Sequence, residues 1–126
     1  MLLKTYGAAV QGVDAIIVTI EVSVEIGFSF NLVGLPDTAV KESYQRMLTA
    51  MKHSGYDFPR RSVVINMSPA DVRKEGAAYD LPLALSILAA SEQIKGDELA
   101  RYMIMGELSL DGSLLPIRGV LPMAIK

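Results

Sequence analysis

The sequence contains no cysteine, no tryptophan and a single histidine. The absence of cysteine excludes disulfide bonds, zinc–thiolate sites, iron–sulfur clusters and thiol catalysis. His53 has no second histidine with which to bind a transition metal, so we expect no metal site. A chain without cysteine also suits a reducing compartment, and we expect a cytoplasmic protein.

Long apolar runs are also missing. The longest covers residues 81–90 and contains Pro82 and Ser86. A membrane-spanning helix needs about 20 apolar residues, and a secretion signal needs a basic start before its apolar region. We therefore expect neither a membrane span nor a secretion signal.

Positive charge is not in excess, because 12 Lys and Arg face 14 Asp and Glu, giving a net charge of −2. Nucleic-acid binding would therefore need a local basic patch. Apolar residues make up 51% of the 126 residues, and the mean hydropathy is +0.34. A chain of this length folds as one domain, and this apolar composition predicts that part of its surface faces a partner.

Alternating apolar and polar residues predict a series of short strands. They are expected at residues 2–10, 15–25, 28–34, 61–67, 102–108 and 114–117. We expect the second and third strands to form an antiparallel hairpin around Ile26 and Gly27. A turn at Asp111 and Gly112 is expected to pair the last two strands.

Two helices are predicted between these strands. Apolar residues at positions 40, 44, 47, 48 and 51 form one stripe of a helix that begins with Asp37 or Thr38 as N-cap and ends at Gly55. The second helix is apolar on all sides, with Asp80 as its N-cap and Pro82 in its first turn. We expect it to lie between the sheet and another element.

The element order β-β-β-α-β-α-β-β-α favours an α+β fold, specifically a two-layer sandwich with one mixed sheet. The last helix is expected to begin at Gly119, only a few residues before the chain stops at Lys126 without a C-cap. We therefore expect residues 1–126 to be a single domain that is a fragment of a longer protein.

Residue patterns alone indicate no catalytic site. No phosphate loop G-x-x-x-x-G-K-[ST] occurs, so we expect the chain itself not to bind ATP. His53 lies at the end of the first helix, where a histidine commonly interacts favourably with the helix dipole. This role is favoured over a catalytic serine–histidine pair. Glu21 and Glu25 lie on the polar face of a strand, which is typical of solvated charge.

Local positive charge is the main indication of function. Around the first helix and the strand that follows, five cations oppose only Glu42 and Asp57, and two more cations follow in the loop at 69–76. This pattern predicts a patch for the phosphate backbone of DNA. We expect no aromatic residues interleaved with these cations, which favours the alternative of an ordinary charged surface. The candidate DNA contacts are Lys41, Arg46, Lys52, Arg60, Arg61, Arg73 and Lys74.

Three segments carry a family resemblance: NLVGLPDTAVKES, NMSPADVRKEGAAYDLPLALSILAAS and GELSLDGSLLPIRGVLPMA. In this order they resemble the N-terminal domain of the magnesium-chelatase-like competence protein ComM family, the YifB-type AAA+ ATPases. The resemblance covers nearly the whole chain. It implies a Lon-protease-like domain, with the fold called ribosomal protein S-five domain-two-like, placed before an AAA+ ATPase module in a protein several times longer.

The same resemblance implies a role and partners. The family is linked to DNA processing in natural transformation and recombination, where a ring of ATPase subunits drives branch migration. A homo-oligomer is therefore expected, as a hexameric ring, with DNA as a candidate partner and with neither a membrane nor a small-molecule substrate. We expect no cofactor in this segment, whereas ATP and Mg are expected for the missing ATPase module. Magnesium insertion is not implied.

The Lon relationship also indicates where a catalytic dyad would lie. Lon-type proteases use a Ser nucleophile that a Lys activates. The Ser position, before the apolar helix, is occupied by Ala78, and the Lys position, after Pro-Ile-x-Gly, by Leu121. Neither side chain can act, so we expect a non-catalytic domain that packs against subunits or contacts DNA in a parent ATPase. The alternatives are a peptidase relic that uses Ser68 and Lys74, and a pure oligomerisation module.

The remaining motif residues are expected to be structural. Glycines supply backbone conformations or close approaches that a Cβ would block, and prolines rigidify loop entries. These motif residues are Gly34, Pro36, Pro69, Asp71, Gly76, Asp80, Pro82, Gly106, Glu107, Gly112, Pro116, Arg118 and Gly119.

Overall fold

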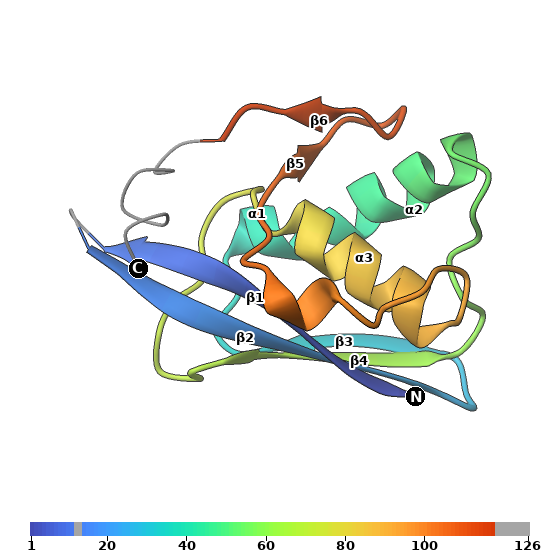
Figure 1. Cartoon of the computed structure of the whole chain (residues 1–126), viewed down its shortest axis with the longest axis horizontal. Helices are drawn as coiled ribbons and strands as arrows, with labels where there is room; N and C mark the ends of the chain where they lie inside the picture. The colour runs from blue at the N-terminus through green and yellow to red at the C-terminus, as the bar shows by residue number, and fades with distance from the viewer. Residues whose placement is uncertain (12–13, 118–126) are drawn as a thin grey trace.

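A computed structural model of the chain describes residues 1–11 and 14–117 (Figure 1). The strands are β1 (Leu2–Gln11), β2 (Asp14–Glu25), β3 (Ser29–Val33), β4 (Ser62–Ser68), β5 (Glu107–Leu108) and β6 (Leu114–Leu115). The helices are α1 (Thr38–Lys41), α2 (Ser43–His53), α3 (Asp80–Ala90) and the short 3-10 helix η1 (Leu99–Arg101).

Four strands form one mixed sheet in the order β1-β2-β4-β3. The first two are a long antiparallel pair, in which Leu2 lies opposite Ser23. Strand β4 runs antiparallel to β2 and parallel to β3. The expected hairpin between β2 and β3 is therefore wrong, because β4 lies between them. Alternation of apolar residues shows which face of a strand is buried, but it carries no information on which strands are neighbours.

Helices α2 and α3 cover one face of this sheet, so the molecule has two layers (Figure 1). The structure thus confirms the α+β class with a mixed sheet. The core lies between the layers and contains buried side chains from each of them. They include Val18, Ile20, Val22, Val63, Ile65, Met67, Met47, Leu83, Ile87 and, as the largest, Tyr79.

The first helical segment is divided in two. Asp37 is the N-cap of α1, and its Oδ1 accepts a hydrogen bond of 2.8 Å from the Val40 amide, which decides between the two expected caps. Its Oδ2 also accepts from the Gly76 amide at 3.1 Å. Glu42 then separates α1 from α2. Asp37 therefore caps a helix and also fixes the loop that leads to α3.

The expected strand at 102–108 is wrong in its extent. Only Glu107 and Leu108 pair as a strand, with Leu114 and Leu115 of β6. Upstream, the Ile104 amide donates to the Tyr6 carbonyl at 2.8 Å, and the Gly106 amide donates to the Ala78 carbonyl at 2.7 Å. These backbone amides of the segment thus find hydrogen-bond acceptors in β1 and in the loop before α3, without forming a regular strand pairing. The helix expected from Gly119 lies outside the described residues.

None of the helices within residues 1–11 and 14–117 has both the length and the apolar character needed to cross a membrane.

Candidate functional site

A broad groove of about 1180 Å³ lies where the end of α2, the start of β3 and the loop at 54–61 meet. In Figure 1 this loop, drawn in green, runs along one end of the molecule from the helix layer to β4. Three cations line the groove, Lys52, Arg60 and Arg61. Five aromatic side chains also line it, namely Phe28, Phe30, Tyr44, Tyr56 and Phe58. We call this site the basic groove.

The aromatic residues of the basic groove correct one expectation from the sequence. Tyr44, Tyr56 and Phe58 lie between the cations along the chain, and the fold adds Phe28 and Phe30 from the sheet. All three phenylalanines and two of the five tyrosines of the protein therefore gather at this site. Aromatic rings therefore lie in the same groove as the cations.

Three of these rings pack on one another. The centroid of Tyr44 lies 4.7 Å from that of Phe30 and 5.2 Å from that of Phe58, and Phe30 and Phe58 are 5.9 Å apart. Tyr44 and Phe58 meet edge to face at 80°. Such pairs are worth about 0.5–1.5 kcal/mol each beyond the area they bury. The cluster fixes the loop at 54–61 against α2 and β3.

Hydrogen bonds hold the backbone of the same loop. Gln93 accepts from the Asp57 amide at 3.0 Å and donates to the Asp57 carbonyl at 2.6 Å. The Tyr56 amide donates to the Met51 carbonyl at 2.8 Å. These bonds fix the backbone of the loop at Tyr56 and Asp57, just before Phe58 packs into the ring cluster.

The charges of the basic groove are exposed. Lys52, Arg60 and Arg61 all face solvent, and none of them takes part in the ion pairs found within residues 1–11 and 14–117. Asp57 is the one carboxylate among the described lining residues. Three positive groups and one negative group around a concave surface favour an anionic ligand.

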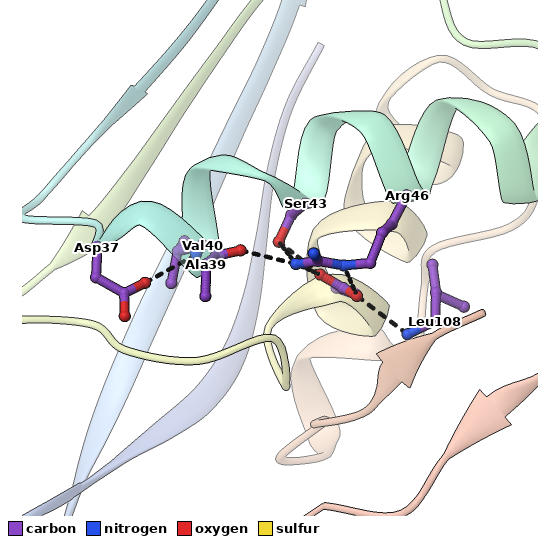
Figure 2. A network of polar contacts seen from close by, with 7 residues as sticks. Asp37, Ala39, Val40, Ser43, Arg46 and Leu108 are labelled. Carbon is purple, nitrogen blue, oxygen red and sulfur yellow. Dashed lines mark hydrogen bonds and ion pairs between the residues drawn. The ribbon is translucent and has the colours of Figure 1, made fainter. Parts of the chain in front are cut away.

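Arg46, a candidate DNA contact, lies elsewhere and has a different role. Its Nε donates to Asp80 Oδ2 at 2.6 Å and its Nη2 donates to Oδ1 at 3.0 Å. This bidentate pairing raises the pKa of Arg46. A second bond from Nη2 goes to the Ala39 carbonyl at 2.7 Å (Figure 2). The guanidinium is therefore occupied within the fold, and we remove Arg46 from the DNA-contact set.

Asp80 also differs from its expected role. The N-cap of α3 is Tyr79, and Asp80 is the first helical residue, with a fully buried side chain. Besides Arg46, its carboxylate accepts from Ser43 Oγ at 2.5 Å and from the Leu108 amide at 3.0 Å. Figure 2 shows Ser43, Arg46 and Leu108 converging from α2 and β5. A side chain expected to cap one helix instead joins α2, α3 and β5.

Lys74 is a second candidate contact that lies in the interior. Its side chain is fully buried, and Nζ donates to the Pro69 carbonyl. Burial lowers the pKa of this amine. The hydroxyl of Ser68 accepts from Asn66 at 3.3 Å, and within the described residues no hydrogen bond joins Ser68 to Lys74. We therefore remove Lys74 from the DNA-contact set, and the geometry does not favour a Ser68–Lys74 dyad.

Arg73 and Ala78 line a second cavity of about 470 Å³, which also contains Tyr79 and Glu107. Arg73 is exposed and pairs with Glu75 at 3.2 Å, which partly neutralises it. Ala78, at the position expected for a Lon-type nucleophile, presents only a methyl group, and Leu121 lies outside the described residues. Lys41 is exposed on α1 and lines neither cavity.

The other motif residues fall mainly in turns. Positive φ occurs at Gly34, Gly76 and Gly112, and Pro36 forms a bridge with Lys74. The Ser68–Pro69 bond is cis, and Pro82 is buried in the first turn of α3. Arg118 and Gly119 lie outside the described residues, as does the expected helix there.

Tyr79 gives the protein an expected sensitivity to alkali. Its buried hydroxyl donates to the Ala8 carbonyl at 2.9 Å, and burial raises its pKa above the ordinary value of 10.0. The unfolded chain then releases this proton at lower pH than the folded chain, so stability is lost as pH rises above about 10. Urea midpoints measured from neutral pH to pH 11 should fall less steeply in Tyr79→Phe.

The phenylalanine variant should also lose about 1 kcal/mol at neutral pH, the typical contribution of one hydrogen bond. Tyr102→Phe is the matched control, because Tyr102 is exposed on the surface. An equally steep alkaline decline in Tyr79→Phe and in the parent chain would contradict this assignment.

Comparison with known proteins places these observations in a family. Residues 20–126 match the family model described as subunit ChlI of Mg-chelatase. The chain is 45% identical over 117 residues to the uncharacterized protein YifB of Salmonella typhimurium. It is 42% identical over 118 residues to competence protein ComM of Haemophilus influenzae, and 39% identical over 120 residues to an uncharacterized protein of Mycobacterium bovis.

These alignments cover 92%, 93% and 94% of this chain, but only 23%, 23% and 24% of the respective relatives. The chain thus spans about a quarter of the length of the relatives that it matches.

Proposed function

Because the chain belongs to the ChlI family of Mg-chelatase subunits, as a relative of YifB and ComM, we propose that it is a non-catalytic, DNA-contacting domain of a longer ComM-type AAA+ ATPase. The longer protein would process DNA during recombination and natural transformation, as a homo-oligomeric ring. ATP and Mg²⁺ would be bound by its ATPase module, since this chain has no phosphate loop. The domain itself would have the Lon-protease-like fold.

One observation carries the DNA-contact role: three exposed cations from two separate segments surround one groove. Lys52 comes from α2, whereas Arg60 and Arg61 come from the loop before β4. Cations placed in this way neutralise successive phosphates and release the counterions condensed on DNA. Lys41 and Arg73 remain as outlying candidates that could extend the contact.

A non-catalytic role is supported by the cavity that contains Ala78. A nucleophilic mechanism needs a hydroxyl, thiol or amine with its base within hydrogen-bond reach. The buried amine of Lys74 donates to the Pro69 carbonyl, and Ala78 offers no nucleophile. Peptide hydrolysis at this cavity is therefore disfavoured on chemical grounds.

Subunit packing is a second candidate function, and exposed apolar side chains favour it. Ile26 is 93% exposed and Phe28 is 87% exposed at the turn between β2 and β3, and Leu35 is 52% exposed beyond β3. Exposed apolar side chains at both ends of β3, an edge strand of the described sheet, are typical of surfaces that meet a partner. Sedimentation of the chain over a range of concentrations tests this role directly.

The DNA-contact role predicts a strong dependence on salt. Fluorescence anisotropy with labelled DNA should show affinity falling linearly with the logarithm of salt concentration. The triple variant Lys52→Ala, Arg60→Ala, Arg61→Ala should bind more weakly, and its slope should decrease in magnitude by about 3, one unit for each lost phosphate contact.

The matched control removes three exposed cations away from the groove, as Lys4→Ala, Lys95→Ala, Arg101→Ala. Its net charge equals that of the first variant. A difference in DNA binding between the two variants is therefore due to the position of the cations and not to the net charge. Equal losses in both variants, or no binding of the parent chain at about 50 mM salt, would overturn the proposal.

A further inference from the structure

The basic groove contains two aromatic rings that the core does not need. Phe28 is 87% exposed, although a phenylalanine normally gains about 1.5–3 kcal/mol from burial. Tyr56 is 37% exposed on the facing loop. Neither belongs to the packed cluster of Phe30, Tyr44 and Phe58. Their exposure leaves aromatic surface that a ligand can cover.

Resting on the proposed DNA contact, we propose that the basic groove takes single-stranded DNA, with unpaired bases stacked on Phe28 and Tyr56. Lys52, Arg60 and Arg61 then neutralise the backbone of the same strand. A positively charged groove combined with aromatic rings is the usual composition of single-strand binding sites, since every base presents a π-face. Bases within a duplex are already stacked, so a duplex can use only the cations.

Two neutral polar side chains of the groove, Gln93 and Ser91, are already paired within the protein. The side-chain amide of Gln93 accepts from the Asp57 amide through its oxygen. Its nitrogen donates to the Asp57 carbonyl and, at 3.0 Å, to the Ser91 hydroxyl. The Ser91 hydroxyl donates to the Ile87 carbonyl at 2.8 Å. Side chains that are already paired do not read base edges, and stacking tolerates any base.

The charge of the groove agrees with this ligand. Asp57 repels phosphate, but three cations line the same groove, and the backbone of Asp57 is held by Gln93. The fixed loop and the packed ring cluster also mean that little order must be gained on binding. The site is therefore formed before the strand arrives.

The test compares a labelled oligothymidylate strand of about 20 nucleotides with a duplex of equal length by fluorescence anisotropy. The double variant Phe28→Ala, Tyr56→Ala should weaken single-strand binding by about 10-fold or more for each ring removed. Duplex affinity and its salt dependence should not change. The variant Phe28→Trp, Tyr56→Trp should restore single-strand binding, because tryptophan also stacks. Tyr102→Ala removes an exposed ring elsewhere and serves as the control.

Each alternative result is distinct. Equal weakening for single strand and duplex would overturn stacking, while the proposed DNA contact would stand. Binding of the duplex alone would likewise overturn stacking and leave the proposed DNA contact standing. No binding of either DNA by the parent chain would overturn both proposals. Unchanged DNA binding with loss of self-association in the double alanine variant would assign the rings to a subunit interface instead.

Discussion

Replacing Asp80 with alanine is expected to lower the free energy of unfolding by about 3–5 kcal/mol, the usual cost of breaking a buried ion pair. The Asp80 side chain is fully buried and that of Arg46 is 20% exposed. The substitution removes the acceptor of four hydrogen bonds at once, two from Arg46, one from Ser43 and one from Leu108. The Ser43 hydroxyl and the Leu108 amide lose their acceptor in the interior, and Arg46 keeps the bonds from its Nη2 to Ala39 and Ser43. Unpaired buried donors are costly.

Urea unfolding at neutral pH measures this effect, with Asp97→Ala as a control at an exposed carboxylate. The control should change stability by less than about 0.5 kcal/mol. Arg46→Ala should also destabilise the fold strongly, since it leaves the Asp80 carboxylate buried with fewer donors. The double variant should cost less than the sum of the two single variants, because they remove the same contact. A loss below about 1 kcal/mol for Asp80→Ala would show that the network is not structural.

Replacing Gly34 with alanine is expected to cost about 3–5 kcal/mol, from backbone strain and a steric clash together. Gly34 has a φ of +110°, a conformation that side chains rarely permit. A Cβ placed there would lie 2.1 Å from the carbonyl oxygen of Met67 and 2.9 Å from its carbon. This contact is with the backbone of β4, which cannot move without disturbing the sheet.

Gly55→Ala provides the matched control. Gly55 also has positive φ, at +85°, but a Cβ built on it meets nothing within 4 Å. Its substitution should cost only the backbone strain, about 1–2 kcal/mol. Thermal or urea unfolding of the two variants therefore isolates the clash with Met67. Equal losses at both positions would contradict the importance of the close approach.

Local patterns predicted the elements better than their arrangement. In β2, Val18, Ile20 and Val22 alternate with half-buried polar residues, so the strand and its buried face follow from periodicity alone. The position of β4 between β2 and β3 depends on contacts between residues far apart in sequence. Residues 103–105 illustrate the same limit, since Met103 forms only an isolated bridge with Tyr6 and Met105 packs against the core without belonging to a strand.

The candidate site shows a similar division. The charge pattern identified Lys52, Arg60 and Arg61, which the fold brings together around one groove. It also included Arg46, whose partner Asp80 is 34 residues away, and no local signal distinguishes a paired arginine from a free one. The aromatic residues of the groove come from two parts of the chain. Tyr56 and Phe58 lie between the cations in the sequence, where they are a signal for this site, whereas Phe28 joins them only through the sheet.

The strand order also sets a sequence of events during synthesis of the chain. Strands β1 and β2 are adjacent in sequence, so their hairpin can form within microseconds of emerging. In the described sheet β3 pairs only with β4, and its partner residues, 62–66, are made about 30 residues after it. Until then both sides of β3 are unpaired, and in the finished sheet it remains an edge strand, the kind of strand that recruits other chains. It has five residues, with Ser29 and Asn31 alternating with apolar ones, a short and partly polar segment that offers little template for aggregation.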